Sequence, residues 1–361
     1  MPWKRPLTKP RMLAAGDTVA IVTPSWGGPA SFPDRFEAGR RYLTEEFGLR
    51  VVVMPHACQP ADWLDAHPEA RAADVMQAFA DPAIAGVVAS IGGDDAVRLI
   101  PHLDLDVIAG NPKVFLGYSD ATVLHFACLK AGVASFYGPT VMAGFAENGG
   151  MHEFAKSAIR RVLFSAEPPG RLPRNAGGWT DERPDWSDPE NQRRKRRLQA
   201  PAPPKVWQGR GTARGALVGG CAEVLEMLKG TDLWPPLDYW RGAILFYETS
   251  EEAPPPSTVA RWMRNFGAQG ILEILAGVVV GRPGGGVPVE RHDAYGAAIA
   301  KVLAEFGAPH LPLISGLDFG HTDPMTVLPY GVEAEIDCRD ATISLVGAGV
   351  RAAGARAEET P

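Results

Sequence analysis

The sequence predicts an α/β protein in two domains: an N-terminal doubly wound parallel-sheet domain and a C-terminal α/β domain, joined by a long flap or linker. Three observations support this prediction. Buried-strand patterns alternate with helical patterns between residues 17 and 132, residues 168–210 have no sustained period, and alternation begins again near Gly211. Strands that alternate with helices at this interval indicate βαβ units and a parallel sheet. We therefore expect domains over residues 1–167 and 211–361.

The N-terminal elements follow from short apolar runs and from apolar residues at helical spacing. We expect strands at residues 17–23, 49–54, 84–91 and 113–116. We expect helices at residues 34–47, 68–81, 95–102 and 121–130. Gly48 and Gly132 follow two of these helices, at the position where glycine commonly ends a helix. Ligands of such a sheet gather at the carboxyl ends of its strands, which is where Gly92, Gly93 and Ser119 stand.

The stretch 168–210 is rich in proline, glycine and charged side chains. Loops of this length are usually functional or disordered, so we interpret it as a linker that carries a substrate-covering flap. After it, we expect strands at residues 216–218, 242–247, 274–280, 332–337 and 341–346. We expect helices that end at residue 229 and that cover residues 257–266 and 291–306.

Composition limits the partners and the cellular compartment that we expect for this protein. The net charge of −6 over 361 residues argues against nucleic acid as the main partner. The four cysteines are widely spaced without a C-x-x-C pair, so we expect free thiols rather than disulfides. No apolar signal core opens the sequence, and no run approaches the roughly 20 apolar residues that span a bilayer. We therefore expect a cytoplasmic protein without a membrane segment.

The turn Gly117-Tyr118-Ser119-Asp120-Ala121 stands between an expected strand and an expected helix. A strand, a sharp turn, a serine and a helix form a nucleophile elbow, which lifts the hydroxyl out of the sheet. The free N–H groups of the helix then point at whatever the serine attacks. The G-x-S-x-G pattern is incomplete because Ala121 replaces its last glycine. The alternative is that Ser119 only caps the helix, a position that serine favours.

A serine nucleophile needs a base and a group that orients the base. His321 is the strongest histidine candidate because it follows Gly320 in a turn-rich loop, although a surface histidine is the alternative. Glu248 is the matching carboxylate, because it ends an apolar strand and would point out of the sheet into a crevice. The alternative is that Glu248 is a solvated residue at the end of the strand, which Glu251 and Glu252 nearby make more plausible.

An oxyanion hole needs unhindered backbone N–H groups that lie close together. The loop Gly92-Gly93-Asp94 after the expected strand can supply one, and the N–H of Asp120 another. A simple strand-to-helix turn is the alternative for the two glycines. We expect Gly92 and Asp94 to contact substrate. No histidine pair has metal spacing and no phosphate-binding loop is present, so we expect neither a metal nor a cofactor.

The segments SIGGDD, GYSDATVL, LFYE and GLDFGHTDP, in this order, resemble the LD-carboxypeptidase family of serine peptidases (peptidase family S66). The resemblance extends over nearly the whole chain, and its motifs are specific in combination. It implies a two-domain α/β fold with Ser119 as the nucleophile, His321 as the base and Glu248 as the orienting carboxylate. It also implies that the amides of Gly93 and Asp120 form the oxyanion hole.

The family has two branches with different substrates. One trims the L-to-D bond of murein tetrapeptides, and the microcin C self-immunity branch cuts the amide between an aspartyl residue and a nucleotide analogue. The second branch carries a longer loop whose tryptophan stacks on the base, and residues 179–186 look like that loop. Trp186 is the first choice for stacking and Trp179 the second; the alternative is that both pin the linker to the core.

The resemblance therefore implies a small peptide or peptidyl-nucleotide substrate and a homodimer. The basic run Arg193–Arg197 could attract an anionic substrate, but such a run is more often a solvated surface. Three alternatives to a microcin-immunity hydrolase stay open: a murein LD-carboxypeptidase, an α/β-hydrolase esterase, and a non-catalytic binding protein on the same fold.

Overall fold

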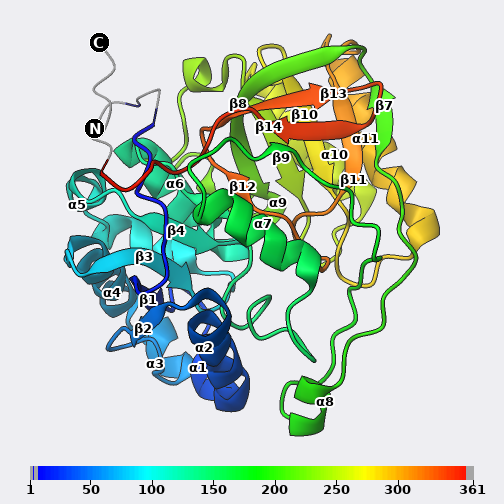
Figure 1. Ribbon diagram of the computed structural model, residues 1–361. Coiled ribbons are helices and arrows are strands. Elements are labelled where there is room, and N and C mark those ends of the chain that lie inside the picture. The colour runs from blue at the N-terminus through cyan, green and yellow to red at the C-terminus, as the bar shows by residue number, and fades with distance from the viewer. Residues whose placement is uncertain (1–2, 4–6, 355–361) are drawn as a thin grey trace.

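The computed structural model describes Trp3 and residues 7–354, and it contains two β-sheets covered by helices (Figure 1). One sheet has six strands and the other has eight. The mixed α/β architecture with two sheets confirms the predicted fold class. The extreme ends of the two expected domains, residues 1–2, 4–6 and 355–361, lie outside the described residues.

The first sheet has the strand order β12-β5-β4-β3-β1-β2. Its strands are β1 (Thr18–Val22), β2 (Arg50–Val53), β3 (Ile84–Ala89), β4 (Val114–Gly117), β5 (Phe136–Tyr137) and β12 (Leu328–Pro329). All neighbours pair in parallel except β12, which runs antiparallel to β5. The chain order reverses between β1 and β3, and ligands of open α/β sheets bind in the crevice at such a switch point.

Helices cover both faces of this sheet, as the alternating pattern predicts. They are α1 (Gly28–Ser31), α2 (Pro33–Phe47), α3 (Ala61–Ala66), α4 (Pro68–Ala80), α5 (Leu105–Gly110), α6 (Thr122–Ala131), α7 (Glu153–Leu163) and the 3₁₀ helices η1 (Ala96–His102) and η2 (Ser119–Ala121). Gly48 and Gly132 end α2 and α6 with φ angles of 67° and 77°. These left-handed conformations cost glycine little, so both expected helix ends are confirmed.

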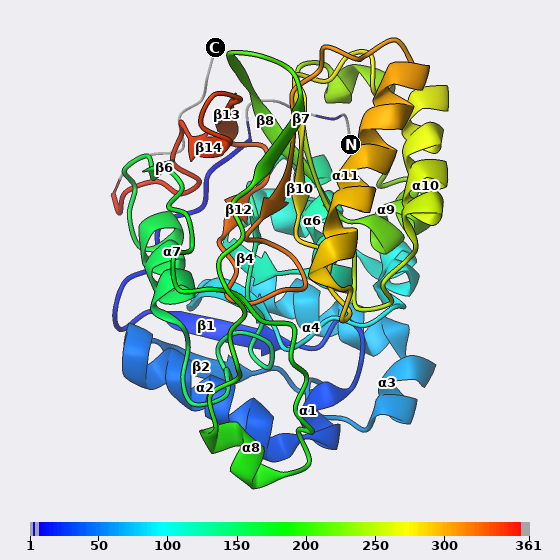
Figure 2. The ribbon, with the colours of Figure 1, turned by 90° about the vertical axis from the view of Figure 1, so that its right-hand side faces the viewer.

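The second sheet is built on four parallel strands, β8 (Thr212–Cys221), β9 (Ile244–Glu248), β10 (Gly277–Gly281) and β11 (Leu313–Leu317). Antiparallel strands extend both edges: β7 (Lys205–Gln208) beside β11, and β13 (Glu333–Asp337), β14 (Thr342–Leu345) and β6 (Gly170–Arg171) beside β8. Helices α9 (Ala222–Leu228), α10 (Pro256–Ala268) and α11 (Val289–Glu305) and the 3₁₀ helix η3 (Leu237–Trp240) complete this half. The helices α10 and α11 lie side by side along the sheet (Figure 2).

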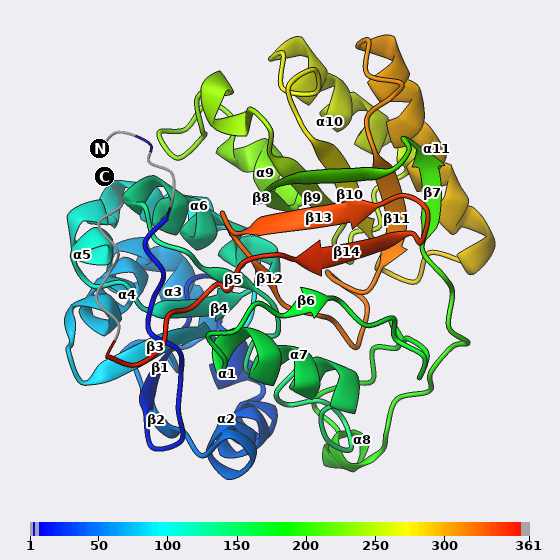
Figure 3. The same cartoon turned by 45° about the horizontal axis from the view of Figure 1, so that its top comes forward.

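The stretch 168–210 is more ordered than a linker would be. Its two ends form β6 and β7 at opposite edges of the second sheet, which Figure 3 shows from above. Its middle carries α8 (Pro189–Arg193), which lies far from the second sheet (Figure 1). There the flap contacts the N-terminal half, because Gly149 N donates to Gln192 O at 2.8 Å. Pairing of these short strands depends on the partner strand, so the local sequence did not predict it.

A cavity of about 810 Å³ opens where the two halves meet. The loops after β1, β3 and β4 line it from the first half, and the end of β8 and the loops after β9 and β11 line it from the second. Among the described residues, no helix is long and apolar enough to cross a membrane. All four cysteines are free thiols, as expected.

Candidate active site

Ser119 occupies a strained turn between β4 and α6. Its φ angle is 60°, a left-handed conformation that is uncommon for residues other than glycine and that collects at functional sites. The turn needs Gly117 before it, because a Cβ there would lie 2.9 Å from the Cβ of Ala121. Ser119 is not a capping residue, because Tyr118 is the N-cap of η2 and Ala121 is the N-cap of α6. The strand, turn and helix therefore have the nucleophile-elbow arrangement that the sequence indicated.

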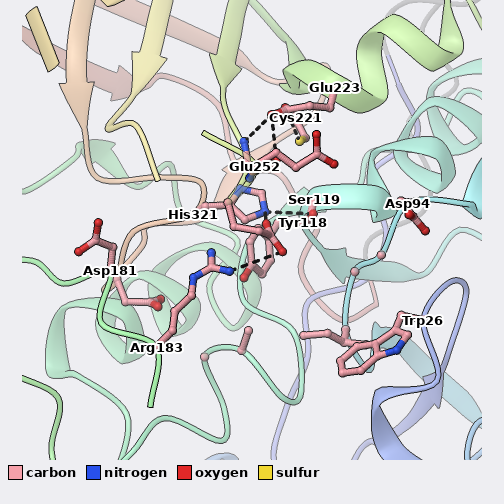
Figure 4. Close-up of a pocket in the computed structure, with 18 of the residues that line it drawn as sticks. Trp26, Asp94, Tyr118, Ser119, Asp181, Arg183, Cys221, Glu223, Glu252 and His321 are labelled. Atoms are coloured by element: carbon pink, nitrogen blue, oxygen red, sulfur yellow. Dashed lines mark hydrogen bonds and ion pairs between the residues drawn. The ribbon is translucent and has the colours of Figure 1, made fainter. Parts of the chain in front are cut away.

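His321 lies in the loop after β11 and contacts both Ser119, as Figure 4 shows, and Glu248. Its Nε2 atom is 3.0 Å from Ser119 Oγ, and its Nδ1 atom is 2.7 Å from Glu248 Oε2. The imidazole is buried and its centre is 4.9 Å from that of the Tyr118 ring. The structure thus brings together three residues that are 73 to 202 positions apart in the sequence.

Glu248 ends β9 and is fully buried. Gly320 makes room for it, since a Cβ there would lie 2.5 Å from Glu248 Oε2. Its other oxygen, Oε1, accepts a hydrogen bond from the hydroxyl of Tyr137, and that hydroxyl accepts one from Ser119 N at 3.1 Å. Glu248 is therefore not a solvated strand end; both of its oxygens are held by donors.

The sequence did not reveal that Tyr137 contacts Glu248 or that Glu251 contacts His321. Tyr137 forms half of a two-residue strand, and so short a strand has no period. Glu251 Oε2 lies 3.1 Å from His321 Nε2, although its position beside Glu248 indicated only a solvated strand end. Both contacts depend on tertiary structure.

The two carboxylates next to His321 control its charge. Burial alone would lower the pKa of His321, but Glu248 and Glu251 outweigh it and raise this pKa to about 10. The hydrogen bond to His321 outweighs burial at Glu251 and lowers the pKa of that carboxyl to about 2. These contacts therefore favour the protonated, positively charged form of His321.

The glycine loop after β3 lies directly against Ser119. A Cβ on Gly92 would lie 3.0 Å from Ser119 Oγ and 3.5 Å from Asp120 N, so only glycine fits there. Gly93 has a φ of 151°, and a Cβ on it would meet Ser25 Oγ at 2.1 Å. Next to it, the exposed Asp94 lines the cavity.

Asp120 and Asp95 hold this loop in place. The buried carboxylate of Asp120 accepts a hydrogen bond from Ala96 N at 2.7 Å. Asp95 binds both terminal nitrogens of the buried Arg71, at 2.7 and 2.8 Å. The loop backbone is thus fixed before any ligand arrives, which electrostatic stabilisation of a transition state requires.

An aromatic wall lines the cavity on the side of the N-terminal half and the flap. It consists of Trp26, Phe32 and Trp186. The ring centre of Phe32 lies 6.0 Å from that of Trp26 and 5.7 Å from that of Trp186. The guanidinium of Arg35 lies 4.1 Å from the centre of the Trp186 ring and holds it by a cation–π contact. Figure 4 shows Trp26 on the opposite side of the cavity from Asp181.

Trp179 lies away from the cavity, so the expectation that it contacts substrate is wrong. Only 1% of it is exposed, and its ring packs against Arg282 at 4.8 Å and His292 at 5.5 Å. Its backbone pairs with that of Gln199 across the base of the flap. An aromatic side chain this large gains more by burial than by exposure, so Trp179 pins the flap to the core.

The basic run is mostly a solvated surface, with one exception. Arg193, Arg194, Lys195 and Arg197 are exposed, whereas the Arg196 side chain is only 9% exposed. Arg196 forms ion pairs with Glu147 and, at 2.6 Å, with Asp323. Its role is to connect the flap to both halves.

Cys221, Glu248 and His321 each place a possible metal-ligating atom within 4.8 Å of the other two. Glu248 and His321 already bond to each other, and the Cys221 thiol donates to Glu223 at 3.2 Å. Burial, followed by the charges of Glu248 and Glu223, raises the pKa of Cys221 well above its usual value, so the thiolate that binds metals is disfavoured. We therefore interpret these residues as a hydrogen-bonded network.

Both halves of the chain are similar to known proteins. A family model described as the LD-carboxypeptidase N-terminal domain matches residues 19–138. A second, the LD-carboxypeptidase C-terminal domain, matches residues 214–336. The microcin C7 self-immunity protein MccF of Escherichia coli is 26% identical over 340 residues, which are 92% of this chain and 94% of that protein. A probable murein peptide carboxypeptidase of Bacillus subtilis (strain 168) is 27% identical over 346 residues, 95% of each chain.

Solved structures agree with these matches. An MccF-like protein from Streptococcus pneumoniae in complex with AMP superposes with a TM-score of 0.81 at 29% identity, covering 91% of this chain and 98% of that one. MccF in complex with aspartyl sulfamoyl adenosine superposes with a TM-score of 0.82 at 25% identity, covering 95% and 99%. Because both halves match one family and its relatives extend along nearly the whole length, the chain belongs to the LD-carboxypeptidase family of hydrolases (peptidase family S66).

Proposed function

We propose that this protein is a serine-nucleophile amide hydrolase whose catalytic triad is Ser119, His321 and Glu248. The observation that carries the proposal is the chain of contacts from Ser119 Oγ through His321 to Glu248, at 3.0 and 2.7 Å, on the wall of a large cavity. A nucleophile, a base and a group that orients the base are the parts that covalent amide hydrolysis requires.

In the proposed reaction, Ser119 Oγ attacks the amide carbonyl while His321 Nε2 takes the hydroxyl proton. His321 then returns that proton to the leaving amine, which departs from an acyl-enzyme. Water, activated by the same nitrogen, releases the acid and restores the serine. Glu248 accepts a hydrogen bond from Nδ1–H throughout and stays ionised, which fixes the ring and stabilises its positive charge.

The backbone amides of Gly93 and Asp120 are proposed to bind the oxyanion. Support comes from the contact of the glycine loop with Ser119 and from its anchoring by Asp95 and Asp120. Donors that are already in place stabilise developing charge without a reorganisation cost during the reaction. Gly92 and Asp94 adjoin this position and are proposed to contact the substrate.

We propose that the substrate is a peptidyl-nucleotide amide, as in microcin C immunity. MccF binds aspartyl sulfamoyl adenosine and the pneumococcal relative binds AMP, so both accept an adenine nucleotide or its analogue. In this chain the wall of Trp26, Phe32 and Trp186 offers rings on which a base can stack, a contact worth about 1–3 kcal/mol per base.

Murein LD-carboxypeptidase activity is the second candidate. The observation that favours it is the Bacillus subtilis relative, which is as similar to this chain as MccF is, at 27% against 26% identity. The family assignment leaves an α/β-hydrolase esterase without support. A non-catalytic binding protein would not need a strained serine beside a buried histidine–glutamate pair.

The same proposal places the protein in the cytoplasm as a homodimer. Free thiols at all four cysteines agree with a reducing compartment. Light scattering coupled to size exclusion measures the assembly directly; a mass of one chain would contradict the dimer.

Incubation with a murein tetrapeptide and with aspartyl sulfamoyl adenosine, followed by mass analysis of the products, tests the function. Ser119→Ala should reduce turnover of the true substrate by more than about 10³-fold, because triad members act as a unit. Ser157→Ala, on the surface helix α7, is the control and should behave like the wild type. Turnover by Ser119→Ala above about a tenth of the wild-type rate would rule out this nucleophile.

A further inference from the structure

Two side chains compete for one nitrogen of His321. Ser119 Oγ lies 3.0 Å from Nε2, and Glu251 Oε2 lies 3.1 Å from the same atom. On the other side of the ring, Nδ1 is bonded to Glu248. The imidazole therefore lies between two carboxylates.

This arrangement fixes where the protons are. A neutral imidazole has one N–H group. Here that group would be at Nδ1, which donates a hydrogen bond to Glu248. Nε2 would then offer only a lone pair to the carboxylate of Glu251, and two acceptors repel each other at hydrogen-bond distance. The contact requires a proton on Nε2, and an Nε2 that carries a proton cannot take the one from Ser119.

We propose that Glu251 is a displaceable positioning residue: it holds Nε2 of His321 until substrate binds and leaves when substrate enters. The inference rests on the proposed function, in which His321 is the general base. Glu251 thereby keeps the nucleophile unactivated until a substrate occupies the cavity.

The two carboxylates differ in the way this role demands. Glu248 is fully buried and held by Tyr137 as well as by His321, whereas the Glu251 side chain is 48% exposed. Glu251 lies in the loop between β9 and α10 and lines the cavity, where an entering ligand would meet it. The inner carboxylate is thus fixed and the outer one is free to move.

The flap provides a second partner for Glu251. Arg183 Nη1 lies 3.7 Å from Glu251 Oε1, and Arg183 reaches from the flap toward His321 (Figure 4). A carboxylate that leaves His321 therefore keeps an ion pair instead of becoming a lone charge. Arg183 connects the position of the flap to the state of the histidine.

The other groups that face His321 do not account for its charge. They are Tyr118, Cys221 and, two residues along the chain, Asp323. Burial raises the pKa of both the Tyr118 hydroxyl and the Cys221 thiol well above their usual values, so both are neutral. Asp323 is paired with Arg196 at 2.6 Å. Glu248 and Glu251 remain as the two charges that raise the pKa of His321 to about 10.

Titration of His321 by NMR in the free protein is the first test, with Glu251→Gln as the variant and Glu252→Gln as the matched control. Glu252 also lines the cavity but has no ion pair with His321. Loss of a charge in contact with the ring should lower the pKa of His321 by about 1–3 units in Glu251→Gln. Glu252→Gln should titrate like the wild type. Equal titration of Glu251→Gln and the wild type would overturn the proposal.

The second test compares two pH profiles, because kcat/KM reports the groups of the free enzyme and kcat those of the complex. In the wild type, the acidic limb of kcat/KM should lie at higher pH than that of kcat, because Glu251 holds His321 only in the free enzyme. In Glu251→Gln the acidic limb of kcat/KM should shift to lower pH and coincide with the acidic limb of kcat. The kcat limb should stay at the same pH as in the wild type. Coincident limbs in the wild type that both shift in the variant would show that Glu251 never leaves, and would overturn the proposal.

These tests separate this inference from the proposed function. A protein that cleaves neither substrate would contradict the function, yet the NMR titration would still decide whether Glu251 charges His321. A wild type that cleaves substrate with an unchanged titration in Glu251→Gln would retain the function and remove the role of Glu251.

Discussion

Glycine positions determine the space around the proposed nucleophile. A Cβ on Gly92 would lie 3.0 Å from Ser119 Oγ, and one on Gly320 would lie 2.5 Å from a carboxylate oxygen of Glu248. Gly284 has the same relation to His321, whose Cβ would lie 2.7 Å from an added Cβ. Each member of the proposed triad is therefore in contact with a glycine from a different segment.

We expect Gly92→Ala to abolish most activity while the protein stays folded. The added methyl group would lie 2.9 Å from Ser119 Cβ and 3.0 Å from its Oγ, so the hydroxyl must move from His321. Displacements of about 1 Å near reacting atoms reduce rates by about 10²-fold. Steady-state kinetics and circular dichroism measure the two effects.

Gly110→Ala is the matched control for this prediction. Gly110 lies at the end of α5, has no positive φ, and an added Cβ would meet none of the described residues within 4 Å. The activity and stability of the Gly110→Ala protein should equal those of the wild type or improve slightly. Wild-type kinetics in Gly92→Ala would contradict the close contact between the glycine loop and Ser119.

At this scale the sequence indicated the residue types but not their contacts. Ser119, Glu248 and His321 stood at a turn, a strand end and a glycine-flanked loop, and each had a plausible structural alternative. Tyr137 and Glu251 could not be found in that way, because their roles depend on atoms that the fold brings from distant segments.

The elements were predictable where they are long and periodic. The helices α2, α4 and α6 lie within about two residues of their expected bounds, because an apolar face defines each of them and a terminal glycine also ends α2 and α6. β5, β6 and β12 have two residues each, and a pair of residues shows no alternation. β8 begins earlier than expected since its first residues are polar and partly exposed.

The two flap tryptophans illustrate how one element can serve two roles. Trp186 lies in the cavity beside Arg35, and Trp179 lies in the core beside Arg282. Both occur in one proline-rich segment whose sequence has no period, so only the tertiary structure distinguishes them.

We expect Trp186→Ala to raise KM for aspartyl sulfamoyl adenosine by roughly 5- to 150-fold, with a smaller effect on kcat. Stacking worth about 1–3 kcal/mol acts at a distance from the reacting carbonyl and contributes equally to the ground and transition states. A murein tetrapeptide has no base, so its cleavage should hardly change. Michaelis–Menten kinetics on both substrates distinguish the two branches of the family.

Trp179→Ala serves as the comparison for the neighbouring ring. It should lower the free energy of unfolding by about 3–5 kcal/mol, because it removes a buried aromatic side chain, without a selective effect on KM. Unchanged KM values for the nucleotide substrate in Trp186→Ala would remove the support for the immunity branch and favour the murein activity.

At the scale of the molecule, several segments hold the two halves together. β12 returns from the C-terminal half to pair with β5 of the first sheet. Residues near both ends of the described chain also meet, since Met12 N donates to Arg351 O at 2.9 Å. The sequence predicted two domains, but it could not predict such crossings, because each uses only one or two residues.

Arg196 is a buried charged connection between the halves. It binds Glu147 of the first half, Asp323 of the second half and the backbone oxygen of Glu182 in the flap, the last at 3.1 Å. Burial would lower its pKa, but Asp323 and Glu147 outweigh burial and raise it, so the guanidinium stays charged. Its three partners come from three parts of the chain.

Arg196→Gln should therefore destabilise the whole assembly of flap and halves. It leaves Glu147 and Asp323 without their cation, and the removal of one partner from a buried ion pair costs about 3–5 kcal/mol. Urea unfolding measures that loss, and limited proteolysis should cut residues 172–204 faster than in the wild type. Arg193→Gln is the control: its side chain is 79% exposed, and its pair with Glu190 should contribute less than about 1 kcal/mol. If both variants unfolded at the same urea concentration as the wild type, Arg196 would be one more solvated arginine of the basic run.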